Sequence, residues 1–227
     1  NSVLLRAAHE AHVRRFLFFS CSIMYAAQDR PVRETDFTPG DPFIEAYFGA
    51  AWTKVYIEQM CQFYAGLGRC RFTVIRHSNI YGPHDKYDLQ HSHVFGATVS
   101  KVLEGEGPVV VWGDGSEARD SLHIDDLVSF VETALQRAPA ACDIFNVGSA
   151  SLVTVRDLVS RMCDAAGVSR PTLFNAAAPT LRVSVCLDHT KASTTLGWEP
   201  RVSLDDGIRR TLAWRREVIA DDLKEQR

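Results

Sequence analysis

A lysine lies in the middle of the segment AYFGAAWTKVYIEQM (46–60), whose composition is typical of a helix. Residues four apart share one face of a helix, and the residue four positions before Lys54 is Ala50. A tyrosine there would complete a Tyr/Lys pair for proton transfer, whereas an alanine has no proton to give. The segment is therefore either half of such a pair, without its tyrosine, or an amphipathic helix that carries a lysine.

The composition is that of a soluble globular protein. The chain has 227 residues, 46% hydrophobic and 23% charged, so we expect a sizeable core in one large domain or a domain and a half. The net charge is −3 and the pI is near 6.3, which gives no reason to expect nucleic acid or an anionic membrane as a partner. No apolar run approaches the roughly 20 residues that a membrane span needs.

The six cysteines are widely spaced and form no CxxC motif. This spacing argues against a zinc site and against a small disulfide scaffold. Residues 1–16 alternate charged and apolar residues with a helical period, unlike a signal peptide. We therefore expect reduced, mostly buried thiols in a cytoplasmic protein that binds no metal.

The first 83 residues predict helix, strand, loop, helix and strand in that order. The helices are expected at 2–13 and 45–66, and the strands at 15–25 and 69–83. RFLFFSCSIMY (15–25) is apolar along most of its length, as expected for a parallel strand buried on both faces. Two strands joined by a helical crossover are the unit of a doubly wound α/β sheet. Residues 1–83 therefore predict part of a doubly wound, Rossmann-like α/β sheet.

Residues 84–227 predict a smaller α/β domain, with some elements that return to the first part. A helix is expected over 93–104, two further helices flank GWEP (197–200), and RVSVCLD (182–188) is expected to be a strand. Asp125 or Asp126 is expected to cap one helix, and Thr154 another. GDGSEA (113–118) matches a dinucleotide-binding pattern, but a strand pattern follows it where a helix would be needed, so a hairpin turn is the better interpretation.

Six short motifs in fixed order resemble those of one family. They are FSCSIMY, WTKVYIEQM, RHSNIYGP, RDSLHIDDL, FNVGS and LGWEP. They resemble the extended short-chain dehydrogenase/reductases that act on nucleotide sugars, the epimerase/dehydratase group. Within it, NIYGPHDKYDLQHSHV and VVWGDGSEARDSLHIDD most resemble the epimerase-reductases of GDP-4-keto-6-deoxyhexoses. The resemblance implies NADP or NAD as cofactor, a nucleotide sugar as substrate, with GDP-sugar favoured, and a homodimer.

The resemblance assigns catalytic roles to residues at the end of the first strand and in the helix. Cys21 stands where the family has its catalytic Ser or Thr, flanked by Ser20 and Ser22. A thiol is a poorer hydrogen-bond donor than a hydroxyl, so either serine is an alternative source of that group. Lys54 matches the lysine that holds the nicotinamide ribose and lowers the pKa of the neighbouring tyrosine.

Further positions match the family's cofactor and substrate contacts. His77 and Asn79 would lie at the carboxyl end of the second strand, beside cofactor and sugar. His93 resembles the acid that exchanges protons beside the 4-keto group, a task that suits imidazole because its pKa is near neutral. The remaining expected substrate contacts are Lys101, Trp112, Arg119 and Arg182.

The sequence departs from the family pattern in two ways. It contains no glycine-rich cofactor loop after a first strand, which suggests a fragment that lacks about 90 residues, or a chain that pairs with another, or a degenerate remnant. Ala50 occupies the tyrosine position, by natural loss or by deliberate change. Tyr47 is a substitute on the same face, but a helix would place it about 5 Å along the axis from the expected position.

These observations predict an NAD(P)-dependent nucleotide-sugar epimerase/reductase that Ala50 impairs. Alternatives within the group are a C4-epimerase and a 4,6-dehydratase. A dehydratase usually needs an acidic residue just after the catalytic Ser or Thr, and SCSIMY (20–25) offers none. A different class of function, a non-catalytic subunit that binds sugar nucleotides, is also open because of Ala50 and the absent loop.

Overall fold

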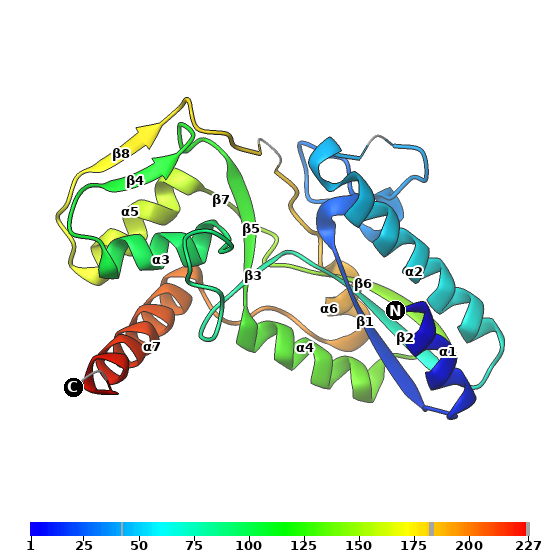
Figure 1. The fold of residues 1–227 in the computed structure, drawn as a ribbon. Coiled ribbons are helices and arrows are strands. Elements are labelled where there is room, and N and C mark those ends of the chain that lie inside the picture. The colour runs from blue at the N-terminus through cyan, green and yellow to red at the C-terminus, as the bar shows by residue number, and fades with distance from the viewer. Residues whose placement is uncertain (42, 182–183, 226–227) are drawn as a thin grey trace.

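The computed structural model describes residues 1–41, 43–181 and 184–225. Two groups of elements stand side by side in Figure 1, joined through β3 and β5. The α-helices are α1 (Ser2–Glu10), α2 (Phe48–Gly66), α3 (Val94–Glu104), α4 (Ile124–Arg137), α5 (Val155–Ala166), α6 (Thr190–Leu196) and α7 (Leu204–Glu225). The strands are β1 (Arg15–Cys21), β2 (Arg71–His77), β3 (Asn79–Tyr81), β4 (Val109–Trp112), β5 (Ala118–His123), β6 (Cys142–Val147), β7 (Leu152–Thr154) and β8 (Thr172–Asn175).

The first group is built on a parallel sheet in the order β1-β2-β6. α2 connects β1 to β2, and the register runs from Arg15 opposite Arg71 to Cys21 opposite His77. The predicted crossover unit is thereby confirmed, with the strands shorter than expected. β6 joins from the second half of the chain and pairs with β2. The fold is α/β with a Rossmann-like parallel sheet, as predicted.

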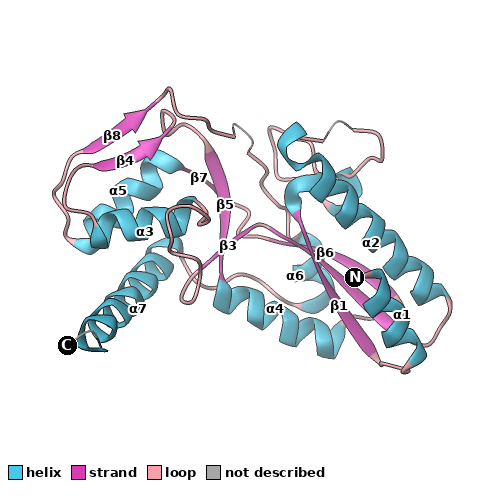
Figure 2. Cartoon of the chain, viewed as in Figure 1, coloured by secondary structure: helices cyan, strands magenta, loops and turns pink. Residues whose placement is uncertain are grey.

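The alternating side chains of β2 fill two cores, one on each face of this sheet. Phe72 and Val74 pack with residues of α1 and α2. Ile75 packs on the opposite face with α4 and α6, where Phe130 meets Phe145 at a ring-centroid distance of 5.7 Å. Each large apolar side chain buried this way contributes about 1.5–3 kcal/mol. Both faces of the sheet are therefore covered by helices (Figure 2).

The second group consists of α3, α5, α7 and five short strands. β4 pairs with β8 in parallel, and β5 pairs with both β3 and β7. The three helices share a core around Val99, Met162 and Leu212, all nearly inaccessible to solvent. Thr154 caps α5 as predicted, because its Oγ1 accepts a hydrogen bond from the amide of Asp157 at 3.0 Å.

The hairpin predicted around residues 113–118 is wrong. β5 follows the turn, as expected, so no helix is present to receive a pyrophosphate. However, β4 pairs with β8 and not with β5, and the two strands belong to different sheets. The sequence pattern shows two strands with a turn between them but does not show which strands pair.

The predicted acidic caps of α4 are also wrong. His123 is the N-cap, and its Nδ1 accepts a hydrogen bond from the amide of Asp125 at 3.2 Å. Asp126 is buried and instead accepts hydrogen bonds from the amides of Arg201 and Val202 at 2.9 and 3.0 Å. This carboxylate therefore fastens the segment before α7 rather than its own helix.

The strand expected over 182–188 is not formed in its described part. Residues 184–188 make a single isolated bridge, between Leu187 and Val32. No disulfide forms among the six cysteines, no candidate metal cluster occurs in the described ranges, and none of the helices described there is both long and apolar enough to span a membrane.

Candidate functional site

Six of the residues predicted for the site line one cleft, at the carboxyl ends of β1 and β2. The cleft has a volume of about 580 Å³. The six residues are Cys21, Ser22, Lys54, His77, Asn79 and His93. They come from β1 and the turn after it, from α2, from β2 and β3, and from the start of α3. Because β1 and β2 are parallel, their last residues meet at one sheet edge, which α2 and α3 then flank.

Lys54 reaches from α2 to the end of β1. Its Nζ donates a hydrogen bond to the carbonyl oxygen of Phe19 at 2.5 Å and lies 5.1 Å from the centre of the Phe18 ring. The side chain is half-buried. These contacts hold the ammonium group at the cleft wall while leaving donors for a bound molecule, since an ammonium group has three.

Cys21 is the last residue of β1, and Ser22 begins the short 3₁₀ turn that follows. Burial raises the pKa of the Cys21 thiol, and the nearby Lys54 opposes this shift only in part. The thiol therefore stays protonated near neutral pH and can donate a weak hydrogen bond. It is a poor nucleophile in this state, since the thiolate is the reactive form.

His77 and Asn79 line the cleft where β2 ends and β3 begins. Burial, with a contribution from Lys54, lowers the pKa of His77, so its neutral form is favoured. Its Nδ1 lies 2.7 Å from the carbonyl oxygen of Ser78 and donates to it, which leaves Nε2 as an acceptor. Asn79 Nδ2 donates to the carbonyl oxygen of Asp120 at 3.0 Å, which leaves its side-chain oxygen as an acceptor.

His93 is the N-cap residue of α3 and is exposed. The imidazole faces the same cleft as Lys54 and Cys21. The residues predicted for the site thus bring to the cleft an ammonium group, a thiol, a serine hydroxyl and two imidazoles. Such a set can hold hydroxyl groups and move protons.

Two predicted residues of the first part lie outside the cleft lining. Ser20 is fully buried and donates a hydrogen bond to Oε1 of Glu58 at 2.5 Å, so its hydroxyl is used inside the core. Ala50 is exposed on the outer part of α2 and does not line the cleft. The alternation of side chains along β1 turns Ser20 away from the face that Cys21 serves.

The predicted phosphate and base contacts lie apart from the cleft. Lys101 lines a separate hollow of about 720 Å³ with Glu104, and burial lowers its pKa. Trp112, at the end of β4, is 60% exposed. The guanidinium of Arg119 donates to the carbonyl oxygens of Ala118 and Leu181 at 2.9 and 2.8 Å. Arg182 lies outside the described residues.

Apart from Tyr47, the other cleft residues were not predicted to have a role. Most come from the segment that leaves β2: Ser78, Ile80, Tyr81, Gly82, Pro83, His84 and Asp85. Gly82 has φ +144°, and a Cβ there would lie 2.6 Å from Ile124 Cγ2, so only glycine fits this turn. His84 is also left-handed, with φ +67°. The run YGPHD (81–85) was the available signal, since clustered turn residues after a strand predict a loop at the sheet edge.

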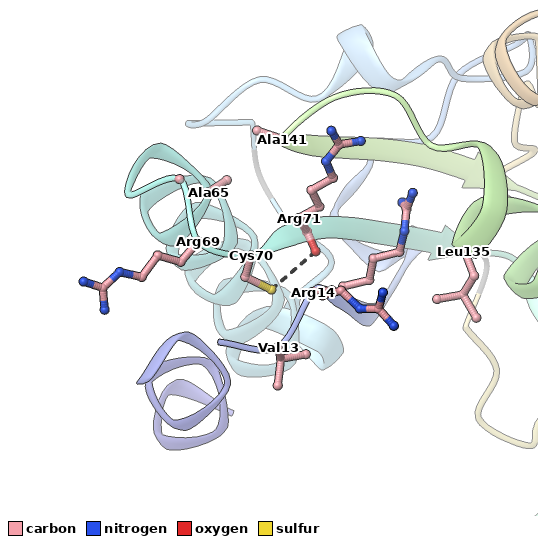
Figure 3. A pocket seen from close by; sticks show the side chains of 10 residues that line it. Val13, Arg14, Ala65, Arg69, Cys70, Arg71, Leu135 and Ala141 are labelled. Carbon is pink, nitrogen blue, oxygen red and sulfur yellow. Dashed lines mark hydrogen bonds between the residues drawn. The ribbon is translucent and has the colours of Figure 1, made fainter. Parts of the chain in front are cut away.

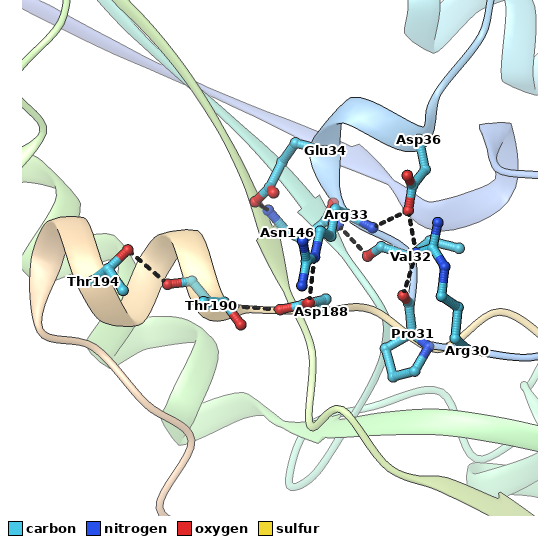
Figure 4. A network of polar contacts seen from close by, with 10 residues as sticks. All are labelled: Arg30, Pro31, Val32, Arg33, Glu34, Asp36, Asn146, Asp188, Thr190 and Thr194. Carbon is cyan, nitrogen blue, oxygen red and sulfur yellow. Dashed lines mark hydrogen bonds and ion pairs between the residues drawn. The ribbon is translucent and has the colours of Figure 1, made fainter.

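A polar network fixes the loop that leads from β1 toward α2 (Figure 4). Glu34 accepts a hydrogen bond from the amide of Asn146 at 2.7 Å, and Asn146 Nδ2 donates to the carbonyl oxygen of Val32 at 2.8 Å. Arg33 pairs with Asp188 at 3.0 Å. The loop is therefore tied both to β6 and to the segment before α6, and it reaches α2 from a fixed starting point.

A hollow of about 850 Å³ lies at the opposite, amino-terminal ends of β1 and β2. Arg14, Arg15, Arg69 and Arg71 line it. In Figure 3 the guanidinium groups of Arg14 and Arg69 point away from each other. They do not converge on one ligand-sized point, and none of the predicted site residues lies there.

Sequence comparison identifies similar proteins. The profile of the NAD dependent epimerase/dehydratase family matches residues 1–148. A putative GDP-L-fucose synthase 2 of Oryza sativa subsp. japonica is 33% identical over 86% of this chain and 57% of its own length. The GDP-L-fucose synthase of Escherichia coli K12 is 28% identical over 94% of this chain and 70% of its own. The chain thus spans little more than half of the rice relative.

Solved structures show the same fold. A UDP-glucose 4-epimerase from Thermotoga maritima with UDP-glucose superposes with a TM-score of 0.83 at 28% identity, covering 96% of this chain and 68% of the other. MoeE5 in complex with UDP-glucuronic acid and NAD has a TM-score of 0.83 at 25% identity, covering 96% and 70%. With the profile match over residues 1–148, these likenesses show that the chain belongs to the NAD dependent epimerase/dehydratase family.

Proposed function

We propose that this chain contributes the nicotinamide and sugar end of an NAD(P)-dependent nucleotide-sugar epimerase/reductase. The favoured substrate is a GDP-linked 4-keto-6-deoxyhexose. The observation that carries the proposal is the single cleft that gathers Lys54, Cys21, His77 and His93 at the carboxyl ends of parallel strands. The similarity to GDP-L-fucose synthases of plants and of E. coli supports the choice of substrate.

Proton exchange beside the keto group would fall to Cys21 and His93. Both line the cleft, and they approach it from different elements, β1 and the start of α3. A proton on a carbon next to a ketone is acidic enough for a positioned base to remove, and a second group on the other side can return it on the opposite face. This pairing would invert a stereocentre without any change of oxidation state.

The donors of the cleft fit the nicotinamide end of a dinucleotide. The Lys54 ammonium suits ribose hydroxyls, because one of its three donors is used on Phe19 and the others remain. When bound, NAD(P) supplies or accepts the hydride. A cation beside the reacting oxygen also stabilises the negative charge that develops there.

Arg119 and Trp112 would hold the nucleotide portion. An arginine offers a planar fork of donors and a permanent charge to a diphosphate. The indole of Trp112 is largely exposed and could stack on a base. Under this proposal residues 1–83 form the cofactor part and residues 84–227 mainly the sugar-nucleotide part, with β6 returning to the first sheet.

A UDP-sugar 4-epimerase is the second candidate. The T. maritima structure that superposes on 96% of this chain is a UDP-glucose 4-epimerase. Such an enzyme needs the hydride transfer but not the proton exchange beside the keto group. His93 would then be dispensable, which separates the two candidates.

We also propose a cytoplasmic homodimer that pairs through α1 and α2. α2 and its C-cap residue Leu67 expose a row of large apolar side chains, the others being Phe48, Trp52, Tyr56 and Phe63. On α1, Val3 and Leu4 are 69% and 60% exposed. Apolar rows of this kind usually mark an interaction surface.

A substrate survey tests the proposed function. The longest translated product that contains this chain is incubated with NADPH or NAD and with GDP-, UDP- and dTDP-sugars, and nicotinamide absorbance and product stereochemistry are followed. Consumption of NADPH with a GDP-4-keto-6-deoxyhexose supports the proposal. Turnover of UDP-glucose without a keto intermediate being supplied would favour the 4-epimerase. Binding of nucleotide sugars with no turnover of any would leave only the non-catalytic reading.

A further inference from the structure

Tyr47 is placed differently from what a continuous helix would give. It ends a 3₁₀ turn (Glu45–Tyr47), and α2 begins only at Phe48. Its backbone has φ −110° and ψ 4°, outside the helical region. This is the bridge region, where residues at turns and in active sites are often found. The expected displacement of 5 Å along the helix axis therefore does not apply.

The side chain of Tyr47 lines the cleft together with Lys54, Cys21 and His93. It is half-buried, as expected of a group that forms a wall and still meets solvent or ligand. Ala50, four residues before Lys54, is exposed and does not line the cleft. The structure thus places the phenol of Tyr47 at the site, although the position of the family tyrosine is occupied by Ala50.

One other tyrosine, Tyr81, also lines the cleft, but its hydroxyl is directed elsewhere. Its ring stacks on Phe95 with centroids 4.1 Å apart. The hydroxyl packs so closely against Gly207 of α7 that a Cβ there would lie 2.1 Å from it. The residue is 2% exposed, and burial raises its pKa. Tyr81 is a core residue whose ring edge reaches the cleft.

The remaining four tyrosines are not part of the cleft lining: Tyr25, Tyr56, Tyr64 and Tyr87. Tyr25 and Tyr87 are buried and donate their hydroxyl hydrogens to Asn146 Oδ1 and to the carbonyl oxygen of Gly82, each at 2.7 Å. Tyr56 is 52% exposed on the outer face of α2. Among the tyrosines, all within the described ranges, Tyr47 is thus the one placed to act on a bound sugar.

We propose that Tyr47 is the acid–base phenol of this cleft, in place of a tyrosine at position 50. The inference rests on the proposed function. During reduction Tyr47 gives its proton to the keto oxygen while the keto carbon receives a hydride from the reduced nicotinamide dinucleotide, so that C=O becomes CH–OH. The phenolate that remains is stabilised by the Lys54 ammonium and regains a proton from water. Ala50 then does not impair the chain.

The test separates the two kinds of proton transfer. Tyr47→Phe keeps the ring and removes the hydroxyl. We expect NADPH consumption to fall by about 100-fold or more, the usual range for loss of a general acid. Solvent deuterium should still exchange into the carbons beside the keto group at close to the unsubstituted rate, because that exchange uses Cys21 and His93. Tyr64→Phe, whose ring packs on His9 at 5.3 Å, is the matched control and should leave both rates unchanged.

If the Tyr47→Phe variant reduces the substrate as fast as the Tyr64→Phe variant, the assignment is wrong. It is also wrong if adding Ala50→Tyr to the Tyr47→Phe variant restores activity. A second measurement does not depend on turnover. Nitration by tetranitromethane is mapped by mass spectrometry with and without GDP-sugar and NADP. Protection of Tyr47, with Tyr64 unaffected, supports its place at the site; equal nitration of Tyr47 in both conditions contradicts it. An inactive chain that still shows this protection would refute the proposed function alone.

Discussion

Ser20 donates its hydroxyl hydrogen to Glu58 at 2.5 Å, joining the end of β1 to the middle of α2 inside the core. Glu58 also pairs with Arg76 of β2, with Nη2 and Oε2 2.6 Å apart and both side chains almost inaccessible to solvent. A serine expected at the cofactor site thus belongs to a buried ionic cluster. That cluster holds together the three elements that carry Cys21, Lys54 and His77.

Breaking this buried pair should cost much of the protein's stability. Glu58→Gln leaves the Arg76 guanidinium buried without its counter-charge, and we expect the free energy of unfolding to fall by about 3–5 kcal/mol. Urea denaturation followed by circular dichroism measures it. The control is Glu104→Gln, which breaks the partly exposed pair with Arg215 and should cost no more than about 1 kcal/mol. Similar losses for both variants would contradict this interpretation.

Replacement of the Cys21 thiol at the end of β1 should change the turnover rate. A serine hydroxyl is far less acidic than a thiol, so Cys21→Ser and Cys21→Ala should both lower turnover in the proposed reaction, by about 100-fold or more, the usual range for loss of a group that transfers a proton. Steady-state rates with saturating sugar and cofactor give the comparison. Cys70→Ser, at the opposite end of the sheet, is the control and should leave the rate unchanged. If Cys21→Ala is as fast as the native chain, the side chain has no part in the reaction.

Stability should decrease in mild acid because of His123. This imidazole caps α4 as an acceptor, and burial lowers its pKa below the value of about 6.5 that it has in the unfolded chain. Below about pH 6.5 the unfolded chain therefore binds more protons than the folded one. The free energy of unfolding consequently decreases as the pH is lowered. The full contribution is present above that pH.

Urea titrations at about pH 7.5 and about pH 5 should show this loss. His123→Asn keeps a capping side chain but does not titrate, so the difference between the two pH values should shrink. His77 shifts in the same direction and remains in the variant, so some dependence will persist. An unchanged difference would show that His123 is not responsible.

The exposed row on α2 predicts the assembly state. Tyr56→Lys and Phe63→Lys each place a charge on the proposed contact face and should convert a dimer to a monomer, because an unpaired charge is costly in an apolar interface. Sedimentation velocity at several concentrations measures this. Val128→Lys on α4, where Val128 is 49% exposed, is the control. A native chain that sediments as a monomer throughout would rule out this dimer.

The local patterns predicted the elements well. α3 and α5 begin within one or two residues of their expected starts, and β1, α2 and β2 form the crossover that apolar strands around a helix imply. The sequence did not predict which strands pair, or which side chains bond to each other, when they lie far apart in the chain. β4 pairs with β8, some sixty residues away, and Asp126 is used by Arg201 and Val202 instead of its own helix. Such pairings depend on the packing of the whole chain and leave no local signal.

The site residues that lie at strand ends were predictable from the sequence. The one that lies in the 3₁₀ turn before α2 was not. Cys21 and His77 meet because parallel strands end at one edge, which the strand pattern implies. Tyr47 could not be placed, because helical periodicity was extended through residues 45–47, which form a 3₁₀ turn. A single departure from the α-helix at its first residues was enough to change which side chain faces the cleft.

β2 and β3 are separated by Ser78 alone, so one nearly continuous stretch of chain passes from the first sheet into the second. His77 and Asn79 stand on either side of that residue, and both line the cleft. At this point the two halves of the molecule are therefore connected by a single residue next to the cleft. Tyr47 and Lys54, from the first half, and His93, from the second, therefore line one cleft that extends across this junction.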